Sequence, residues 1–162
     1  PQTVQSAVRA LSKHGAAFAT IHGNDSIMAA AAKDKGDMKV LAVTMLNSLD
    51  EGDVRDLGFQ VDVKDIVLSR AKRALQLGCD GVISSGLEVS ELRRHLGDNF
   101  IVVTPGIRPV KNTDDQKRTV DVEEAFQNGA DYIVVGRPIK EHANPKQAAA
   151  DIQQRIRKIF SS

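Results

Sequence analysis

Residues 129–139 read Gly-Ala-Asp-Tyr-Ile-Val-Val-Gly-Arg-Pro-Ile, and this stretch joins a strand directly to a helix. Gly129 is suited to end the preceding helix, because glycine tolerates the positive φ of a helix C-cap. Residues 132–135 form a continuous apolar run, as expected of a strand that is covered on both faces. The Gly-Arg-Pro that follows predicts a helix or helical turn, since proline fits a first helical position. The stretch therefore predicts one strand–helix unit of a parallel sheet.

The same pattern recurs along the whole chain, with short apolar runs followed by longer amphipathic runs. The predicted strands cover residues 17–22, 39–45, 81–84, 101–104 and 132–135. The predicted helices cover residues 3–14, 25–35, 61–77, 88–96, 122–128 and 145–160. Glycines suited to a C-cap end several of these helices: Gly15, Gly36, Gly78, Gly97 and Gly129. Regular alternation of this kind predicts parallel strands joined by right-handed crossovers.

In two of the predicted helices, the spacing of residues indicates which face is buried and which is exposed to solvent. The helix at residues 61–77 gathers on one face Val63, Ile66, Val67, Arg70, Ala71, Ala74 and Leu75. An apolar stripe of this kind is typical of a helix that lies on a sheet. In the helix at residues 88–96, we expect Arg93 and Arg94 to lie on a solvated face.

The chain has 162 residues with no shift in composition and no linker rich in proline or serine, so a single domain over residues 1–162 is expected. A (β/α)₈ barrel takes about 250 residues, or roughly 31 per unit, so five units take roughly 155. The length therefore suits five eighths of a barrel. It suits a small, complete doubly wound sheet equally well, and the pattern leaves both architectures open.

Composition excludes several classes of protein. The chain is 41% hydrophobic and 27% charged, and its 22 Lys and Arg against 21 Asp and Glu give a formal net charge of +1. The charges are interspersed, so neither nucleic acid nor a membrane is expected as a partner. The single cysteine, Cys79, predicts a core residue in a protein of the reducing cytoplasm. The four histidines and this cysteine show no metal-ligand spacing, so no metal is expected.

A candidate anion site follows the last predicted strand, at Gly136-Arg137-Pro138. Glycine lets a ligand approach the backbone closely, and N–H groups at a helix start together with the guanidinium fork favour an anion. A phosphate fits better than a carboxylate, because its three oxygens can use both kinds of donor. A tight turn whose Arg137 points to solvent explains the same residues, and this alternative stays open.

A long polar loop follows the preceding strand, over residues 105–118. Loops beyond about 12 residues without structure are usually functional or disordered. This one begins with rigid prolines and carries the donors Arg108, Gln116 and Arg118. Beside an anion site it predicts a segment that is mobile without ligand and closes over a bound phosphate. A solvated surface loop is the alternative, although barrels often build phosphate sites from the loops after strands seven and eight.

The segments that follow the last two predicted strands resemble the orotidine 5′-phosphate decarboxylase family of the bacterial type. The resemblance rests on Thr104-Pro-Gly-Ile-Arg108, Asp114-Asp-Gln116 and Gly136-Arg-Pro138, and it extends in order over essentially all 162 residues. Residues 19–22, 41–48 and 79–85 resemble the family's strands four, five and six. The resemblance implies a TIM (β/α)₈ barrel, of which this chain carries about five βα units, strands four to eight. It also implies a homodimeric lyase without cofactor or metal that converts orotidine 5′-monophosphate (OMP) to uridine 5′-monophosphate (UMP) in pyrimidine biosynthesis.

The resemblance also assigns roles to individual residues. It implies that the 5′-phosphate is held by Arg108, Gln116, Gly136 and Arg137. It places Pro105 near the base and Asn47 and Ser48 against the pyrimidine. Asn47 stands where the family usually has threonine, and its amide can still donate and accept hydrogen bonds. Thr3 resembles a threonine that reaches the ribose of the neighbouring subunit's substrate.

The resemblance implies that the catalytic residues lie upstream of Pro1. The family's Asp-x-Lys-x-x-Asp array and a second lysine do not occur at the matching place in this chain. Asp62-Val-Lys-Asp65 resembles such a cluster only superficially, because aspartate at a helix start caps N–H groups. We therefore expect the isolated chain to be inactive. We also expect it to leave two sheet edges open, with either strands from another segment or exposed apolar faces.

Two alternative functions remain. One is a sugar-phosphate decarboxylase or aldolase of the same barrel group, against which the Asp114-Asp115-Gln116 loop argues. The other is a non-catalytic module that binds phosphate or a nucleotide.

Overall fold

The structure is a computed structural model that describes residues 1–46, 48–108 and 118–161. Its strands are β1 (Phe18–His22), β2 (Lys39–Val43), β3 (Gly81–Ile83), β4 (Ile101–Thr104) and β5 (Tyr132–Ile133). Its helices are α1 (Gln2–Lys13), α2 (Asp25–Lys33), α3 (Glu51–Asp56), α4 (Val63–Gln76), α5 (Val89–Leu96), α6 (Val122–Gln127), α7 (Arg137–Lys140) and α8 (Pro145–Phe160). Every strand and helix predicted from the sequence is present with small shifts at its ends. The short helix α3 was not predicted.

The order of the strands decides between the two architectures that length leaves open. All five strands are parallel and lie side by side in the order β1-β2-β3-β4-β5. A doubly wound sheet changes direction at a switch point, so neighbours in space are not all neighbours in sequence. Strictly sequential neighbours match consecutive βα units of a barrel. The fold is therefore a five-stranded parallel α/β sheet of the TIM-barrel type.

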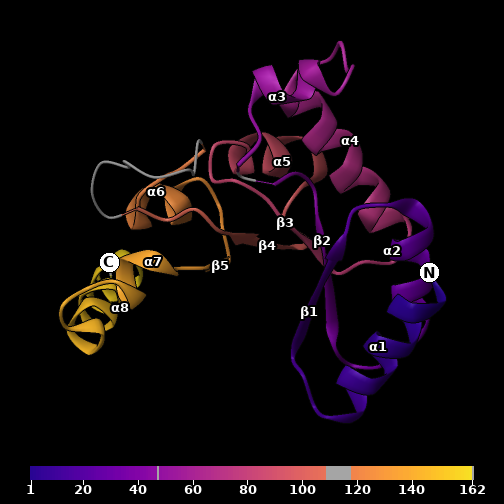
Figure 1. The fold of residues 1–162 in the computed structure, drawn as a ribbon. Coiled ribbons are helices and arrows are strands. Elements are labelled where there is room, and N and C mark those ends of the chain that lie inside the picture. Colours follow the sequence, from indigo (N-terminus) through magenta and orange to yellow (C-terminus); the bar gives the residue numbers. More distant parts are fainter. Residues whose placement is uncertain (47, 109–117, 162) are drawn as a thin grey trace.

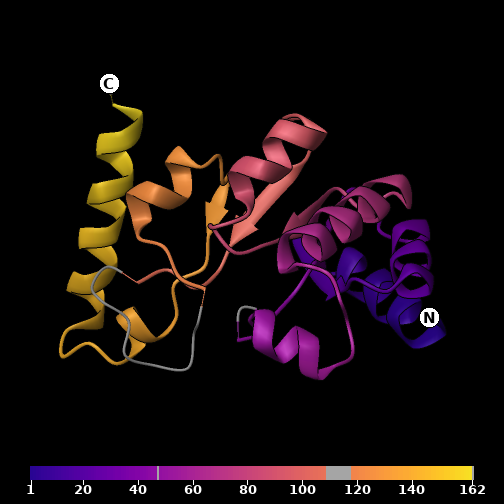
Figure 2. The same ribbon diagram turned by 90° about the horizontal axis from the view of Figure 1, so that it is seen from above.

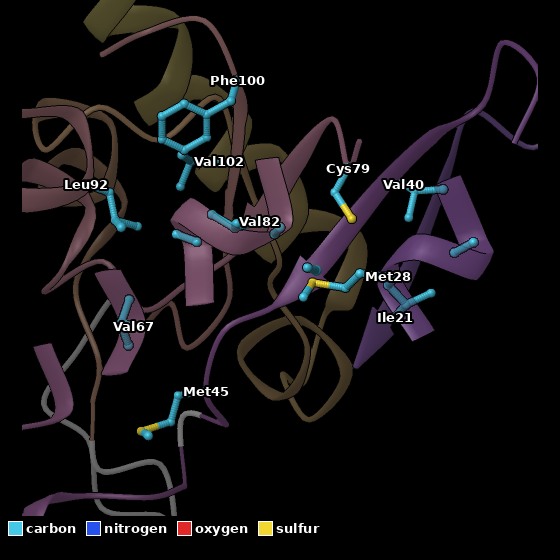
Figure 3. Close-up of a cluster of buried hydrophobic side chains, with 14 of the residues drawn as sticks. Ile21, Met28, Val40, Met45, Val67, Cys79, Val82, Leu92, Phe100 and Val102 are labelled. Atoms are coloured by element: carbon cyan, nitrogen blue, oxygen red, sulfur yellow. The ribbon is translucent and has the colours of Figure 1, made fainter. Parts of the chain in front are cut away.

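The helices cover one face of this sheet. A row of residues in register crosses the first four strands at Ile21, Ala42, Val82 and Val102. These side chains are buried in the main hydrophobic core, to which the helices add Met28, Val67 and Leu92 (Figure 3). In Figure 1 the helices form an arc along this face, from α1 and α2 through α4 and α5 to α6 and α8. Parallel strands with helices on one side are what a barrel wall requires.

Cys79 lies in this core, directly before β3. Its side chain is buried and faces the interior beside Val40 and Val82 (Figure 3). Burial raises the pKa of its thiol to about 11, so the sulfur stays protonated near neutral pH. The prediction of a small core residue is confirmed.

The opposite face of the sheet exposes apolar side chains. Phe18 of β1 is 40% exposed, Tyr132 of β5 is 50% exposed, and Val134 is 51% exposed. The rings of Phe18 and Tyr132 make an edge-to-face contact with centroids 5.3 Å apart, so the first and last strands approach each other at their amino ends. Between these strands no described helix covers the sheet (Figures 1 and 2). The described residues thus form the opened sheet with exposed apolar side chains that the sequence predicts.

Charged side chains at the amino ends of the strands hold the sheet together. Asp80 precedes β3 and accepts a hydrogen bond from the backbone N–H of Val40 at 2.9 Å, and Lys35 pairs with it at 2.6 Å. Asp131 precedes β5 and accepts from the N–H of Val102 at 2.7 Å. The two aspartates stand at equivalent places, each directly before a strand, β3 and β5, which indicates a structural role for this edge.

The prediction that Arg93 is solvated is wrong. Its side chain is 13% exposed and donates hydrogen bonds to the carbonyls of Gly129 and Phe100 and to Asp131. The guanidinium also lies over the Phe100 ring, 4.7 Å from its centroid. Helical spacing puts Arg93 on the polar side of α5, but the loop before β5 covers that side and provides the carbonyls.

Candidate functional site

Buried polar side chains gather at the carboxyl ends of the strands. Within the described ranges, the buried polar and charged residues are Thr44, Ser84, Ser85, Glu88, Thr104 and Arg118. Each of them ends or follows β2, β3 or β4. Burying a polar group costs free energy unless it finds a partner, and in barrels ligands bind at this end of the strands. The carboxyl edge is therefore the candidate functional site.

Backbone hydrogen bonds keep the strand ends side by side at this edge. The N–H of Thr44 donates to the carbonyl of Ile83 at 3.2 Å, and the N–H of Ser84 donates to Val103 at 3.2 Å. The N–H of Val134 donates to the carbonyl of Thr104 at 2.9 Å. The segments that leave β2, β3, β4 and β5 consequently start from neighbouring positions.

The end of β5 has the geometry that the sequence predicts. Gly136 stands directly before the short helix α7 and has a φ of −102°. A Cβ atom at Gly136 would meet no other atom within 4 Å, so the backbone there is open to an approaching group. Arg137 begins α7 and is half-buried. The predicted helical turn is confirmed, with a length of four residues.

The two limbs of the loop after β4 are joined at their base. Ile107 forms a parallel bridge with Val120, and the N–H of Arg108 donates to the carbonyl of Val120 at 3.0 Å. Gly86, in the loop after β3, leaves room for Val120, because a Cβ at Gly86 would lie 2.4 Å from a Val120 methyl group. The base of this loop is thus fixed against the loop after β3. Residues 109–117, with the predicted loop closure and Gln116, lie outside the described residues.

Arg118 does not have the predicted role of a donor to a ligand. Its side chain is 7% exposed, and its Nη1 lies 2.8 Å from Oε1 of Glu88, whose side chain is 5% exposed. Its Nη2 donates to the carbonyl of Leu46 at 3.1 Å. Burial raises the pKa of the Glu88 carboxyl above its ordinary value, and the Arg118 guanidinium opposes this shift without cancelling it. The guanidinium of Arg118 is therefore engaged by groups of the protein.

The structure brings some of the predicted site residues together. Pro105 and Arg108 follow β4, and Gly136 and Arg137 follow its neighbour β5. Ser48 is exposed in the turn after β2. Asn47, like Gln116, lies outside the described residues.

Thr3 does not join this group. It is exposed on α1, and Figures 1 and 2 place the N-terminal helix at the opposite end of the molecule from α7 and α8. Its implied contact with the substrate of a neighbouring subunit remains an expectation.

Sequence reasoning missed two residues that shape the edge. Glu88 gave no signal, because a lone glutamate at a helix start is typical of a solvated N-terminus. Arg70 gave one, as a charged residue among the apolar positions of its helix. Its guanidinium donates to the carbonyl of Thr44 at 2.8 Å and lines a cavity of about 170 Å³ with His22, Met45 and Leu46.

Among the described residues, neither a candidate metal site nor a membrane-spanning helix is found. Among residues 1–46, 48–108 and 118–161, no group of three or more His, Cys, Asp or Glu side chains could hold a metal ion. Across the described chain, none of the helices combines the length and the apolar character needed to cross a membrane.

Comparisons with known proteins agree with the sequence resemblance. A family model described as "Orotidine 5'-phosphate decarboxylase / HUMPS family" matches residues 1–152. The orotidine 5′-phosphate decarboxylase of Methylococcus capsulatus is 61% identical over 100% of this chain and 68% of its own length. The protein of that name from Nitrobacter winogradskyi is 48% identical over 93% of this chain and 64% of its own length. The crystal structure of orotidine 5′-phosphate decarboxylase from Lactobacillus acidophilus superimposes with a TM-score of 0.80, at 35% identity, over 95% of this chain and 69% of that chain. The chain thus spans about two thirds of the length of these relatives.

Proposed function

This chain belongs to the orotidine 5′-phosphate decarboxylase / HUMPS family, and we propose that it forms the nucleotide-binding part of an enzyme that decarboxylates OMP to UMP. One observation carries the proposal. The segments after β4 and β5, which hold Arg108 and Arg137, start side by side because the N–H of Val134 donates to the carbonyl of Thr104. An arginine on each of two neighbouring segments, together with the open backbone of Gly136, is suited to a phosphate dianion.

In this proposal each predicted residue contacts one part of the nucleotide. Gly136 offers its backbone to the 5′-phosphate, while Arg108, Gln116 and Arg137 supply side-chain donors. Pro105 lies near the base, and the pyrimidine contacts Asn47 and Ser48, which follow β2. Thr3 reaches the ribose in the partner subunit of a homodimer. The enzyme is a cytoplasmic lyase that needs no cofactor.

The bond-breaking step needs groups that we place outside residues 1–162. The bond between C6 and the carboxylate breaks, carbon dioxide leaves, and a lysine protonates C6. We propose that this lysine and its neighbouring carboxylates belong to another part of the full-length protein. The five strands described here are then strands four to eight of an eight-stranded barrel. In the part of the chain that the structure describes, open edges at β1 and β5 and an uncovered apolar face support this assignment.

Turnover by the full-length protein tests the proposed function. We expect OMP to be converted stoichiometrically to UMP and carbon dioxide, as followed by the loss of orotate absorbance and by carbon dioxide release. A panel of pentose and hexose phosphates, offered under the same conditions, tests the aldolase or sugar-phosphate decarboxylase alternative. If a sugar phosphate is turned over and OMP is not, the protein is a sugar-phosphate decarboxylase or aldolase. Binding of UMP without any turnover would indicate a non-catalytic module.

Substituting Gly136→Ala in the full-length protein is expected to weaken phosphate binding without weakening the fold. The added methyl group would meet no protein atom within 4 Å, but it would enter the space through which a phosphate reaches the backbone. We expect KM for OMP to rise about tenfold, the scale of one lost charge-assisted hydrogen bond, with an unchanged melting temperature. An unchanged KM in a folded variant would remove Gly136 from the phosphate site.

A further inference from the structure

The ion pair between Arg118 and Glu88 is the most deeply buried charge pair among the described residues, with side chains 7% and 5% exposed. Such a pair is weak evidence for stability, because the cost of desolvating both charges is comparable to their attraction. In addition, the Oε2 atom of Glu88 is buried and has no hydrogen-bond partner within the described part of the chain, which adds to the cost. The pair is therefore poorly explained as a device that stabilises the fold.

The pair instead fixes the position of the Arg118 guanidinium between the segments that follow β2, β3 and β4. Glu88 lies in the loop after β3, where its N–H donates to the carbonyl of Ser85. Arg118 lies in the second limb of the loop after β4, two residues before Val120. Its other nitrogen, Nη2, reaches the carbonyl of Leu46 after β2 at 3.1 Å. A planar fork can serve two acceptors in fixed directions, and here it joins two segments that are 72 residues apart.

The segment after β2 is held from a second direction as well. Arg70 of α4 donates to the carbonyl of Thr44 at 2.8 Å, two residues before the carbonyl that Arg118 holds. The backbone that leads into Asn47 and Ser48 is therefore fixed by two arginines. Arg70 connects the segment after β2 to helix α4, whereas Arg118 connects the same segment to the loop after β4.

We propose that Arg118, held by Glu88, is a positioning residue that couples the pyrimidine side of the site, after β2, to the phosphate side, after β4. The inference rests on the proposed function, which assigns those two sides. Because one rigid group joins both segments, a nucleotide that engages both meets a site whose two halves are already at the right separation. A ligand that engages only the phosphate side does not need this coupling.

The double variant Glu88→Gln/Arg118→Met of the full-length protein tests the coupling. Removing both charges together avoids leaving one buried charge without a partner, which is the main cost of breaking such a pair. Melting temperature, KM and kcat for OMP, and dissociation constants for UMP and for ribose 5-phosphate are measured. A matched control, Glu123→Gln/Arg155→Met, removes an arginine–glutamate pair that joins α6 to α8. Arg118→Lys serves as a second variant, since it keeps the charge beside Glu88 and loses the fork.

The expected result is a selective loss of nucleotide affinity. The dissociation constant for UMP and the KM for OMP rise about tenfold or more, within the usual range of coupling between sites. The dissociation constant for ribose 5-phosphate changes by less than about threefold, since it engages only one side. The control double variant leaves all three constants unchanged. Arg118→Lys shows the same selective pattern, so the test stands even if the double variant does not fold.

Two results would overturn the inference alone: unchanged UMP affinity in a folded variant, or equal losses for UMP and ribose 5-phosphate. A wild-type protein that neither turns over OMP nor binds UMP would overturn the proposed function, and this inference with it.

Discussion

Residues 1–162 expressed alone are expected to show no measurable turnover of OMP. The proposed function places the protonating lysine and its carboxylates outside residues 1–162, and without them only substrate binding is expected to remain. Enzymes gain a factor of about a million or more from such interactions, so the loss is expected to be at least of that order. The measurement is OMP turnover by the purified chain, after mass spectrometry has established that no upstream residues are present.

The same chain is also expected to associate or to unfold readily. Among the described residues, β1 and β5 each have a strand neighbour on one side only, and Phe18 and Tyr132 are exposed on the uncovered face of the sheet. Open edges and exposed apolar faces favour pairing with other chains. Sedimentation and thermal unfolding, compared with the full-length protein, measure this effect. Turnover within tenfold of the full-length protein would instead place the catalytic residues among residues 1–162.

Arg137→Ala in the full-length protein is expected to lower kcat/KM for OMP by roughly 30-fold or more. This factor corresponds to at least about 2 kcal/mol, the scale of a lost charge-assisted contact to phosphate. Arg137 starts the short helix α7 directly after Gly136, so its loss removes a donor from the strand end that the proposal assigns to phosphate. Steady-state kinetics with OMP measure the change.

Lys140→Ala is the matched control for this experiment. Lys140 is an exposed cation at the other end of α7, and its removal changes the net charge by the same amount. We expect kcat/KM to stay within about twofold of the wild-type value, because exposed charges are strongly screened by solvent. Equal losses in both variants would mean that general positive charge, and not a contact from Arg137, attracts the substrate.

The secondary structure was largely predictable because periodicity and glycine stops agree along this chain. Gly78 and Gly129 end helices with φ values of +91° and +102°, as their positions indicate. Strand β5 is shorter than the predicted residues 132–135, because its partner β4 ends at Thr104. The following Pro105 has no N–H with which to continue the ladder. Helix α3 escaped prediction because six residues are too few to show a helical period.

The candidate site was predictable where it depends on local sequence and unpredictable where it depends on distant partners. The turn at Gly136 and Arg137 follows from three adjacent residue types. The burial of Arg118 does not, because its partner Glu88 is 30 residues away and neither residue signals the other. Arg93 shows the same limit, since the carbonyl of Gly129 that it holds lies 36 residues along the chain.

The most direct test of the proposed nucleotide site is a crystal structure of the full-length protein with bound UMP. We expect the phosphate to contact the Gly136 backbone and the guanidinium of Arg137, with the base toward the segment after β2. A phosphate bound at the opposite edge of the sheet, for example beside Lys35 and Lys39, would contradict it.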